Sequence, residues 1–288
     1  MKRCTGSNEP NRAPNQIMPA NALYFLASAI YVMVLIAALR LLRTGAHGPR
    51  ATAWPVTALF ACAAAVHAYL LWHGIFSLGG LNMNLANAMS LIVWLTVALH
   101  VCATPLRVSI LHPLLAASAA VVLLLPLLIP GGRVLPYADS LAFRLHFLVA
   151  IFGYGLYTVA TLHALIMWFA EHYLHEARVP AIFASLPPLM QMEKLLFTLL
   201  WLAFVFLTLT LVTGVFFSEA LFGKAFELTY KTVFAVFSWV IFGGLLVGRV
   251  AFGWRGLLAV RWTLIGFLML LLSYVGSKFV LEIILHRA

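Results

Sequence analysis

LLFTLLWLAFVFLTLTLVTGVFF, residues 195–217, is a run of apolar, small and hydroxyl-bearing residues without a single charged side chain. A run of about 18 or more such residues is long enough to cross the hydrocarbon core of a bilayer as an α-helix. Stretches of similar length and composition lie at 22–42, 54–73, 84–104, 109–129, 143–170, 231–250 and 262–284. Because backbone N–H and C=O groups in a bilayer must be paired within their own segment, the sequence predicts an all-α, polytopic membrane helix bundle of about eight transmembrane helices.

The composition of the whole chain agrees with this prediction. Of its 288 residues 64% are hydrophobic and only 9% are charged, whereas a soluble domain carries about 25% charged residues. The net charge of +10 fits Lys and Arg in short loops, and the sequence has no basic stripe with interleaved aromatic residues. We therefore expect membrane lipid, and no nucleic acid, as a partner. The three cysteines lack the spacing of a disulfide framework or a metal site.

The chain divides into a polar tail, residues 1–20, predicted to be disordered, and a transmembrane domain, residues 21–288. Met18 is an alternative translation start.

Basic residues concentrate in every second connection between the spans. The basic connections are 43–53, 105–108, 171–194 and 251–261, and the others are 74–83, 130–142 and 218–230. Since basic loops stay in the cytoplasm, we expect a multi-pass protein with both termini on the periplasmic side.

Two of the ten histidines, His67 and His146, are predicted to lie inside the membrane near its outer face. Span two runs outward and span five runs inward, so the two imidazoles can share one level. On span five, Ala150, Gly153 and Tyr157 share a helix face with His146, and the two small residues let a flat ligand or a neighbouring helix approach closely. Two neutral imidazoles in an apolar pocket can ligate one haem iron. Alternatively, each histidine bonds a carbonyl or hydroxyl group across the bundle.

Several longer segments resemble a known family. They are NMNLANAMSLIVWL (82–95), LHFLVAIFGYGLYTVATLHAL (145–165), PPLMQMEKLLF (187–197), FLTLTLVTGVFF (206–217), KTVFAVFSWVIFGGLLVGR (231–249) and LSYVGSKFVLEIIL (272–285). Together they are similar to the cytochrome c assembly protein family, integral membrane proteins that handle haem, and most similar to its YpjD/HemX-type inner-membrane branch. The resemblance covers nearly the whole chain from about residue 20.

The resemblance implies haem b as cofactor and His67 and His146 as its iron ligands. The family's pattern of a histidine, several apolar residues and a tyrosine matches His146 with Tyr154. Lys231 and Trp239 match the continuation of the family's tryptophan-rich outer loop.

The tryptophan-rich run itself is absent from the sequence, and residues 218–230 stand in its place. Tyr230 occupies the position where many members of the branch have a histidine. This departure puts direct transfer of haem to an apocytochrome in doubt.

The function implied is haem handling, or an accessory role, in cytochrome c maturation at the bacterial inner membrane, without enzymatic turnover. The implied partners are haem, bound stably or in transit, and other maturation proteins or an apocytochrome.

Two other functions stay open. A transporter would place histidines in a substrate path. A b-type cytochrome subunit of a quinol oxidoreductase would need two haems, and His100, His112 and His163 do lie toward the inner side.

Overall fold

The structure, a computed structural model of the chain, describes residues 20–43, 54–76, 80–103, 111–129, 140–175, 186, 188–222 and 229–284. The tail before residue 20 and the loop residues 223–228 lie outside this part, as do the side chains of 218–222. The α-helices are α1 Ala20–Arg43, α2 Trp54–Phe76, α3 Leu85–Ala103, α4 Leu111–Val122, α5 Leu125–Leu128, α6 Leu141–His175, α7 Leu189–Phe222, α8 Tyr230–Phe252, α9 Leu257–Leu271 and α10 Ser277–Phe279. Two π-helical segments, Leu272–Gly276 and Val280–Ile284, flank α10.

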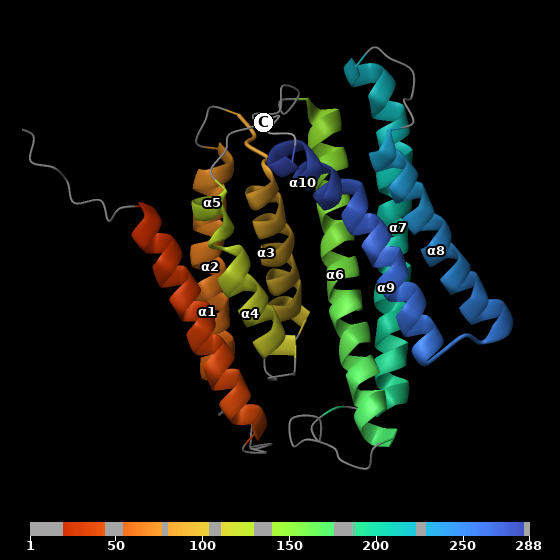
Figure 1. Cartoon of the computed structure of the whole chain (residues 1–288), viewed down its shortest axis with the longest axis horizontal. Coiled ribbons are helices and arrows are strands. Elements are labelled where there is room, and N and C mark those ends of the chain that lie inside the picture. Colours follow the sequence, from red (N-terminus) through yellow and green to blue (C-terminus); the bar gives the residue numbers. More distant parts are fainter. Residues whose placement is uncertain are drawn as a thin grey trace, which may run out of the picture.

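Within the described ranges, eight helices are long and apolar enough to cross a membrane, which confirms the predicted bundle. The long helices run up and down beside one another (Figure 1). The start of α1 and the short helix α10 lie at the same end of the bundle. We call this the outer end, following the orientation predicted from the loop charges, and the opposite end the inner end.

The core has two parts. Buried side chains of α1, α2, α3 and α4 form one apolar cluster, here called the first helix group. Buried side chains of α6, α7, α8 and α9 form another, the second helix group. The two groups meet where α3 packs against α6. At Gly155 of α6 a Cβ atom would lie only 3.0 Å from the Leu95 side chain of α3, so glycine permits this close approach.

The predicted span 109–129 contains a break. Helix α4 ends at Val122 and the short α5 begins at Leu125. Pro126 explains the break, because a proline has no N–H to donate to the carbonyl of Val122 and its ring crowds that carbonyl.

Two other helices exceed the predicted spans. Helix α6 has 35 residues and α7 has 34, so each is about 50 Å long at about 1.5 Å per residue. This length exceeds the hydrocarbon core of a bilayer, which is about 30 Å thick. Both helices therefore tilt or extend beyond the membrane.

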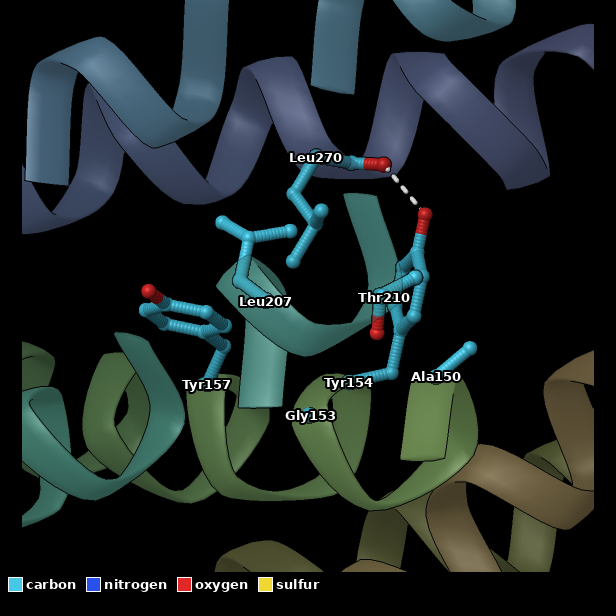
Figure 2. Close-up of a pocket in the computed structure, with 7 residues that line it drawn as sticks. All are labelled: Ala150, Gly153, Tyr154, Tyr157, Leu207, Thr210 and Leu270. Carbon is cyan, nitrogen blue, oxygen red and sulfur yellow. Dashed lines mark hydrogen bonds between the residues drawn. The ribbon is translucent and has the colours of Figure 1, made fainter. Parts of the chain in front are cut away.

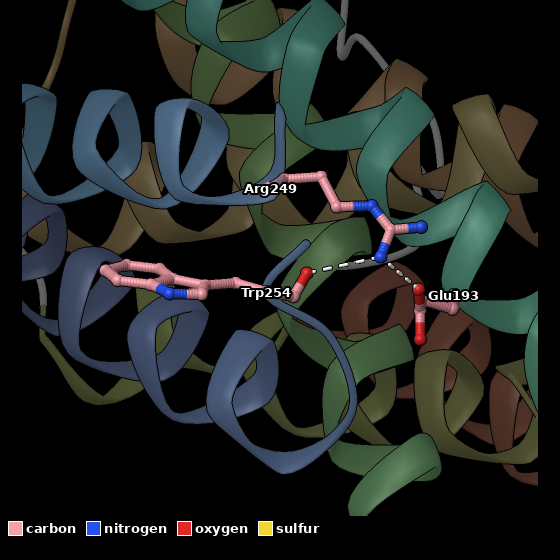
Figure 3. Close-up of polar contacts among 3 residues, drawn as sticks. All are labelled: Glu193, Arg249 and Trp254. Atoms are coloured by element: carbon pink, nitrogen blue, oxygen red, sulfur yellow. Dashed lines mark hydrogen bonds and ion pairs between the residues drawn. The ribbon is translucent and has the colours of Figure 1, made fainter. Parts of the chain in front are cut away.

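An ion pair joins three segments at the inner end (Figure 3). The Nη1 atom of Arg249, in α8, lies 2.6 Å from Oε1 of Glu193, in α7. The same nitrogen donates a hydrogen bond of 3.2 Å to the carbonyl of Trp254, just after α8. The guanidinium also lies 4.6 Å from the centroid of the Phe197 ring. These contacts hold the turn between α8 and α9 against the first part of α7.

This turn depends on glycine. Gly253 and Gly256 have φ angles of 67° and 60°, in the left-handed region that residues with a Cβ atom rarely adopt. The indole ring of Trp254 lies directly on Gly248 of α8, where any added Cβ atom would overlap it.

We expect Gly248→Ala to lower the free energy of unfolding by about 1–3 kcal/mol, because the new methyl group displaces the Trp254 ring. Gly244→Ala, one turn earlier in α8, is the matched control: a Cβ atom there would have its nearest neighbour at 4.0 Å, in the Trp262 ring. Unfolding of both variants in mixed detergent micelles measures the difference. Equal stability of the two variants would contradict the packing described here.

Candidate functional site

His146 lies in the outer part of α6 and faces α7. Its Nδ1 atom is 2.8 Å from Oγ1 of Thr213. Oγ1 of Thr213 also lies 2.7 Å from the carbonyl of Leu209 and 3.2 Å from that of Thr210. When the hydroxyl donates to one of these carbonyls, it accepts a hydrogen bond from His146; the imidazole then carries its proton on Nδ1 and keeps a lone pair on Nε2, which is the tautomer that binds a metal ion.

The His146 ring packs closely against Phe217 and Gly214 of α7. Its ring contacts Phe217 edge to face, with the centroids 6.4 Å apart. A Cβ atom on Gly214 would come within 3.4 Å of the imidazole Cε1. The residue is half-buried. Protein atoms thus hold the ring on one side while part of it stays accessible.

A very small cavity, with room for about one water molecule, lies between α6, α7 and α9 (Figure 2). Its wall is formed by Ala150, Gly153, Tyr154 and Tyr157 of α6, Leu207 and Thr210 of α7, and Leu270 of α9. The prediction that Ala150, Gly153 and Tyr157 share a face is confirmed. Ala150 follows His146 by one helical turn and Thr210 precedes Thr213 by nearly one turn, so the cavity adjoins the His146–Thr213 contact on the membrane-interior side.

Tyr154 and Trp239 also belong to the second helix group. The Tyr154 hydroxyl donates a 2.7 Å hydrogen bond to the carbonyl of Leu270 (Figure 2). The Trp239 indole donates to Oγ1 of Thr208 at 2.9 Å. Both aromatic side chains therefore connect α6 or α8 to a neighbouring helix.

Lys231 and Tyr230 lie in the first turn of α8, at the outer end. The backbone carbonyl of Lys231 accepts a 2.7 Å hydrogen bond from Ser273. Tyr230 is 52% exposed, which suits a residue at the membrane boundary. The structure thus places Tyr154, Trp239, Lys231 and Tyr230 in the same helix group as His146.

His67 lies in the first helix group and is completely buried. Its Nδ1 atom is 3.2 Å from the Tyr31 hydroxyl of α1, and its Nε2 atom is 2.8 Å from Oγ of Ser90 of α3. A neutral imidazole offers one donor and one acceptor, so both ring nitrogens are engaged. His67 joins α1, α2 and α3, which is the alternative that the sequence left open.

The structure does not bring His67 and His146 together. Gly155 of α6 faces α3, and therefore the first helix group. His146 precedes it by nine residues, or half a turn beyond two full turns, and so points to the opposite side of α6. The shared level was predicted from residue counts, which do not fix the direction of a side chain. Joint ligation of one iron by both imidazoles stays a prediction, and it requires His67 to leave Tyr31 or Ser90 and α6 to turn His146 toward the first helix group.

The three inner histidines are engaged as well. His100 Nε2 and His112 Nδ1 are 3.0 Å apart. His163 Nε2 donates to the carbonyl of Met192 at 2.9 Å, which joins α6 to α7.

The comparisons with known proteins decide the family. Residues 56–285 match the model of the family described as cytochrome C assembly protein. The chain belongs to this family. It is 30% identical to the inner membrane protein YpjD of Escherichia coli K12 over 268 residues, which cover 93% of this chain and all of that protein. It is 33% identical to the "uncharacterized 28.8 kDa protein in nifR3-like 5'region" of Azospirillum brasilense, over 51% of this chain and 55% of that protein.

In this member of the cytochrome c assembly family, the matched region contains His67 of the first helix group and His146 of the second. Sequence reasoning missed three polar residues: Thr213 and Ser90, which bond His146 and His67, and Lys278, which bonds the carbonyl of Met83. Thr213 and Ser90 are hydroxyl residues among many in apolar helices, and nothing in the sequence distinguishes them. Lys278 did carry a signal, because it is a charged residue within the last apolar span.

Proposed function

We propose that this protein binds haem b in the bacterial inner membrane and handles it during cytochrome c maturation, without catalytic turnover of its own. His146 is the proposed iron ligand. The observation that supports this proposal most is the hydrogen bond between Nδ1 of His146 and Thr213, which leaves an Nε2 lone pair available in the tautomer with the proton on Nδ1. Histidines that bind a metal are usually held in this way by a partner on the other ring nitrogen.

The cavity beside His146 is mostly apolar. Its wall is aliphatic and aromatic apart from Thr210, and Gly153 lets α7 pack closely there, since a Cβ atom on Gly153 would come within 3.4 Å of Phe206. The cavity has room for only about one water molecule, so a porphyrin would enter there only if the surrounding helices moved apart. When bound, haem would supply the iron and the group to be passed on, whereas the protein would supply the ligand nitrogen and an apolar, water-poor surface.

The other predicted residues receive secondary roles in this proposal. Tyr154 and Trp239 hold the helices that surround the cavity, and Lys231 and Tyr230 lie at the boundary where the polar edge of a ligand meets water. His67 holds the first helix group and ligates iron only if its hydrogen bonds open. An apocytochrome or another maturation protein would then bind at the outer end of the bundle.

A visible spectrum of the detergent-purified protein, with the haem quantified, tests the function. Protein from haem-replete cells is expected to show b-type absorption bands and about one haem per chain. Absence of haem would refute the proposal. A ratio of two haems per chain would favour the b-type cytochrome subunit, and uptake of a solute into proteoliposomes would favour a transporter.

A further inference from the structure

The Tyr154 hydroxyl of α6 is inserted into the backbone of the last transmembrane span. It donates a 2.7 Å hydrogen bond to the carbonyl of Leu270, and the same oxygen is hydrogen-bonded to the backbone of Tyr274. These two backbone groups would pair with each other in an uninterrupted α-helix, where each N–H bonds the carbonyl four residues earlier. A side chain that enters this hydrogen-bond ladder distorts the helix. The π-helical segment Leu272–Gly276 begins at this point, directly after α9.

The π-helical segment determines the direction of α10, which follows it. Its hydrogen-bonded turns contain one more residue than α-helical turns. The side chains after it are therefore rotated by about 100°, the angle of one residue, from their direction in a continuous α-helix. Figure 1 shows α10 turned toward α3 at the outer end. There, Nζ of Lys278 donates a 2.5 Å hydrogen bond to the carbonyl of Met83, just before α3. This contact joins the two helix groups in addition to the packing of α3 on α6.

Tyr154 also lies on the side of α6 that carries the proposed iron ligand. Ala150 and Tyr154 follow His146 by four and eight residues, so the three form one row of about 12 Å along the helix. Ala150 and Tyr154 both line the very small cavity between α6, α7 and α9 (Figure 2). Because this cavity has room for only about one water molecule, a flat ligand that extends from His146 along the row has to displace the Tyr154 ring.

We propose that Tyr154 couples ligand binding at His146 to the contact between the two helix groups. This inference rests on the proposed function. When the ligand displaces the ring, the hydroxyl leaves the last span, and the two backbone groups it separated pair with each other. The π-helical segment then becomes α-helical, and α10 turns by about 100°. Lys278 leaves the carbonyl of Met83, and the two helix groups separate at the outer end.

The separation can be measured as a distance between two spin labels in the full-length protein in nanodiscs. Phe76→Cys, at the end of α2, and Phe279→Cys, in α10, carry the labels, because both side chains are exposed. The native cysteines are replaced by serine. A turn of about 100° moves a side chain that lies about 5 Å from the helix axis by more than about 5 Å, which pulsed electron paramagnetic resonance resolves.

The first comparison needs no ligand. Tyr154→Phe keeps the ring and lacks only the hydroxyl, so it is expected to lengthen the distance by about 5 Å or more. Tyr157→Phe is the matched control in the same helix. The Tyr157 hydroxyl is buried and has no hydrogen-bond partner among the described residues, so its removal should leave the distance unchanged.

The second comparison uses haem and does not depend on the folding of Tyr154→Phe. Haem added to the wild type should lengthen the distance to that of Tyr154→Phe without haem. His146→Ala should abolish this response. In Tyr154→Phe, haem should add little to the distance, because α10 has already turned.

A competing explanation assigns the position of the π-helical segment to α8. The Ser273 hydroxyl in this segment donates a 2.7 Å hydrogen bond to the carbonyl of Lys231. Ser273→Ala tests this explanation: a longer distance in that variant, with none in Tyr154→Phe, would overturn the role of Tyr154.

Three further results would overturn the inference. They are an unchanged distance in folded Tyr154→Phe, an equal change in Tyr157→Phe, and a wild type that binds haem without any change in distance. A wild type that binds no haem would instead refute the proposed function, and with it the ligand-driven step. A longer distance in Tyr154→Phe would then still support the contact of Tyr154 as the one that directs α10 toward α3.

Discussion

His146→Ala is expected to abolish haem binding, lowering the affinity more than about 100-fold, while leaving the fold intact. Loss of an orienting partner alone typically lowers metal affinity about 10–100-fold, and removal of the ligand nitrogen costs more. The side chain is half-buried and contacts α7 at its outer part, so its loss should affect stability little. Haem titration of the purified apoprotein, followed in the visible range, measures the effect.

Thr213 and Thr210 provide a matched pair for the same experiment. Both threonines donate to the carbonyl four residues earlier in α7, but only Thr213 bonds His146. Thr213→Val should therefore weaken haem binding about 10–100-fold, and Thr210→Val should weaken it much less. Equal effects of the two substitutions would contradict the orienting role of Thr213, and retention of haem in His146→Ala would exclude His146 as the ligand.

His67→Ala is expected to act mainly on stability, lowering the free energy of unfolding by about 2–5 kcal/mol. The substitution removes a completely buried ring and leaves the Tyr31 and Ser90 hydroxyl groups without their partner in an apolar environment. Unfolding of the apoprotein in mixed micelles measures this loss.

A double-mutant cycle with Ser90→Ala provides the control for His67. Because the two side chains share a hydrogen bond, the double variant should be more stable than the sum of the single effects predicts. If His67→Ala instead leaves stability unchanged and converts a low-spin haem spectrum to high spin, His67 is an iron ligand and the structural role assigned here is wrong.

The fold was largely predictable because the bilayer limits the possible structures. The run at 195–217 could only be a spanning helix, and the same reasoning located the other seven spans. The interruption at Pro126 follows from the missing N–H of proline, but its exact consequence, a separate α5, depends on local packing. The π-helical turns around Lys278 could not be predicted, since a single widened turn hardly changes the hydrophobic pattern.

The candidate site was predictable only in part. Residue spacing placed Ala150, Gly153 and Tyr157 on one face of α6, because helical periodicity is independent of the rest of the fold. The relation between His67 and His146 is different, since it depends on how α2 and α6 are rotated about their own axes. That rotation is set by contacts such as Gly155 against Leu95, which no count along the sequence reveals.

The connection between α8 and α9 has a consequence for how the protein is made. Only four residues, from Gly253 to Gly256, separate the two helices, and their backbone already turns back tightly at both glycines. Because this link is so short, one of the two helices cannot remain outside the bilayer while the other spans it. We therefore expect the ribosome-bound chain to deliver these two segments to the lipid as a single hairpin.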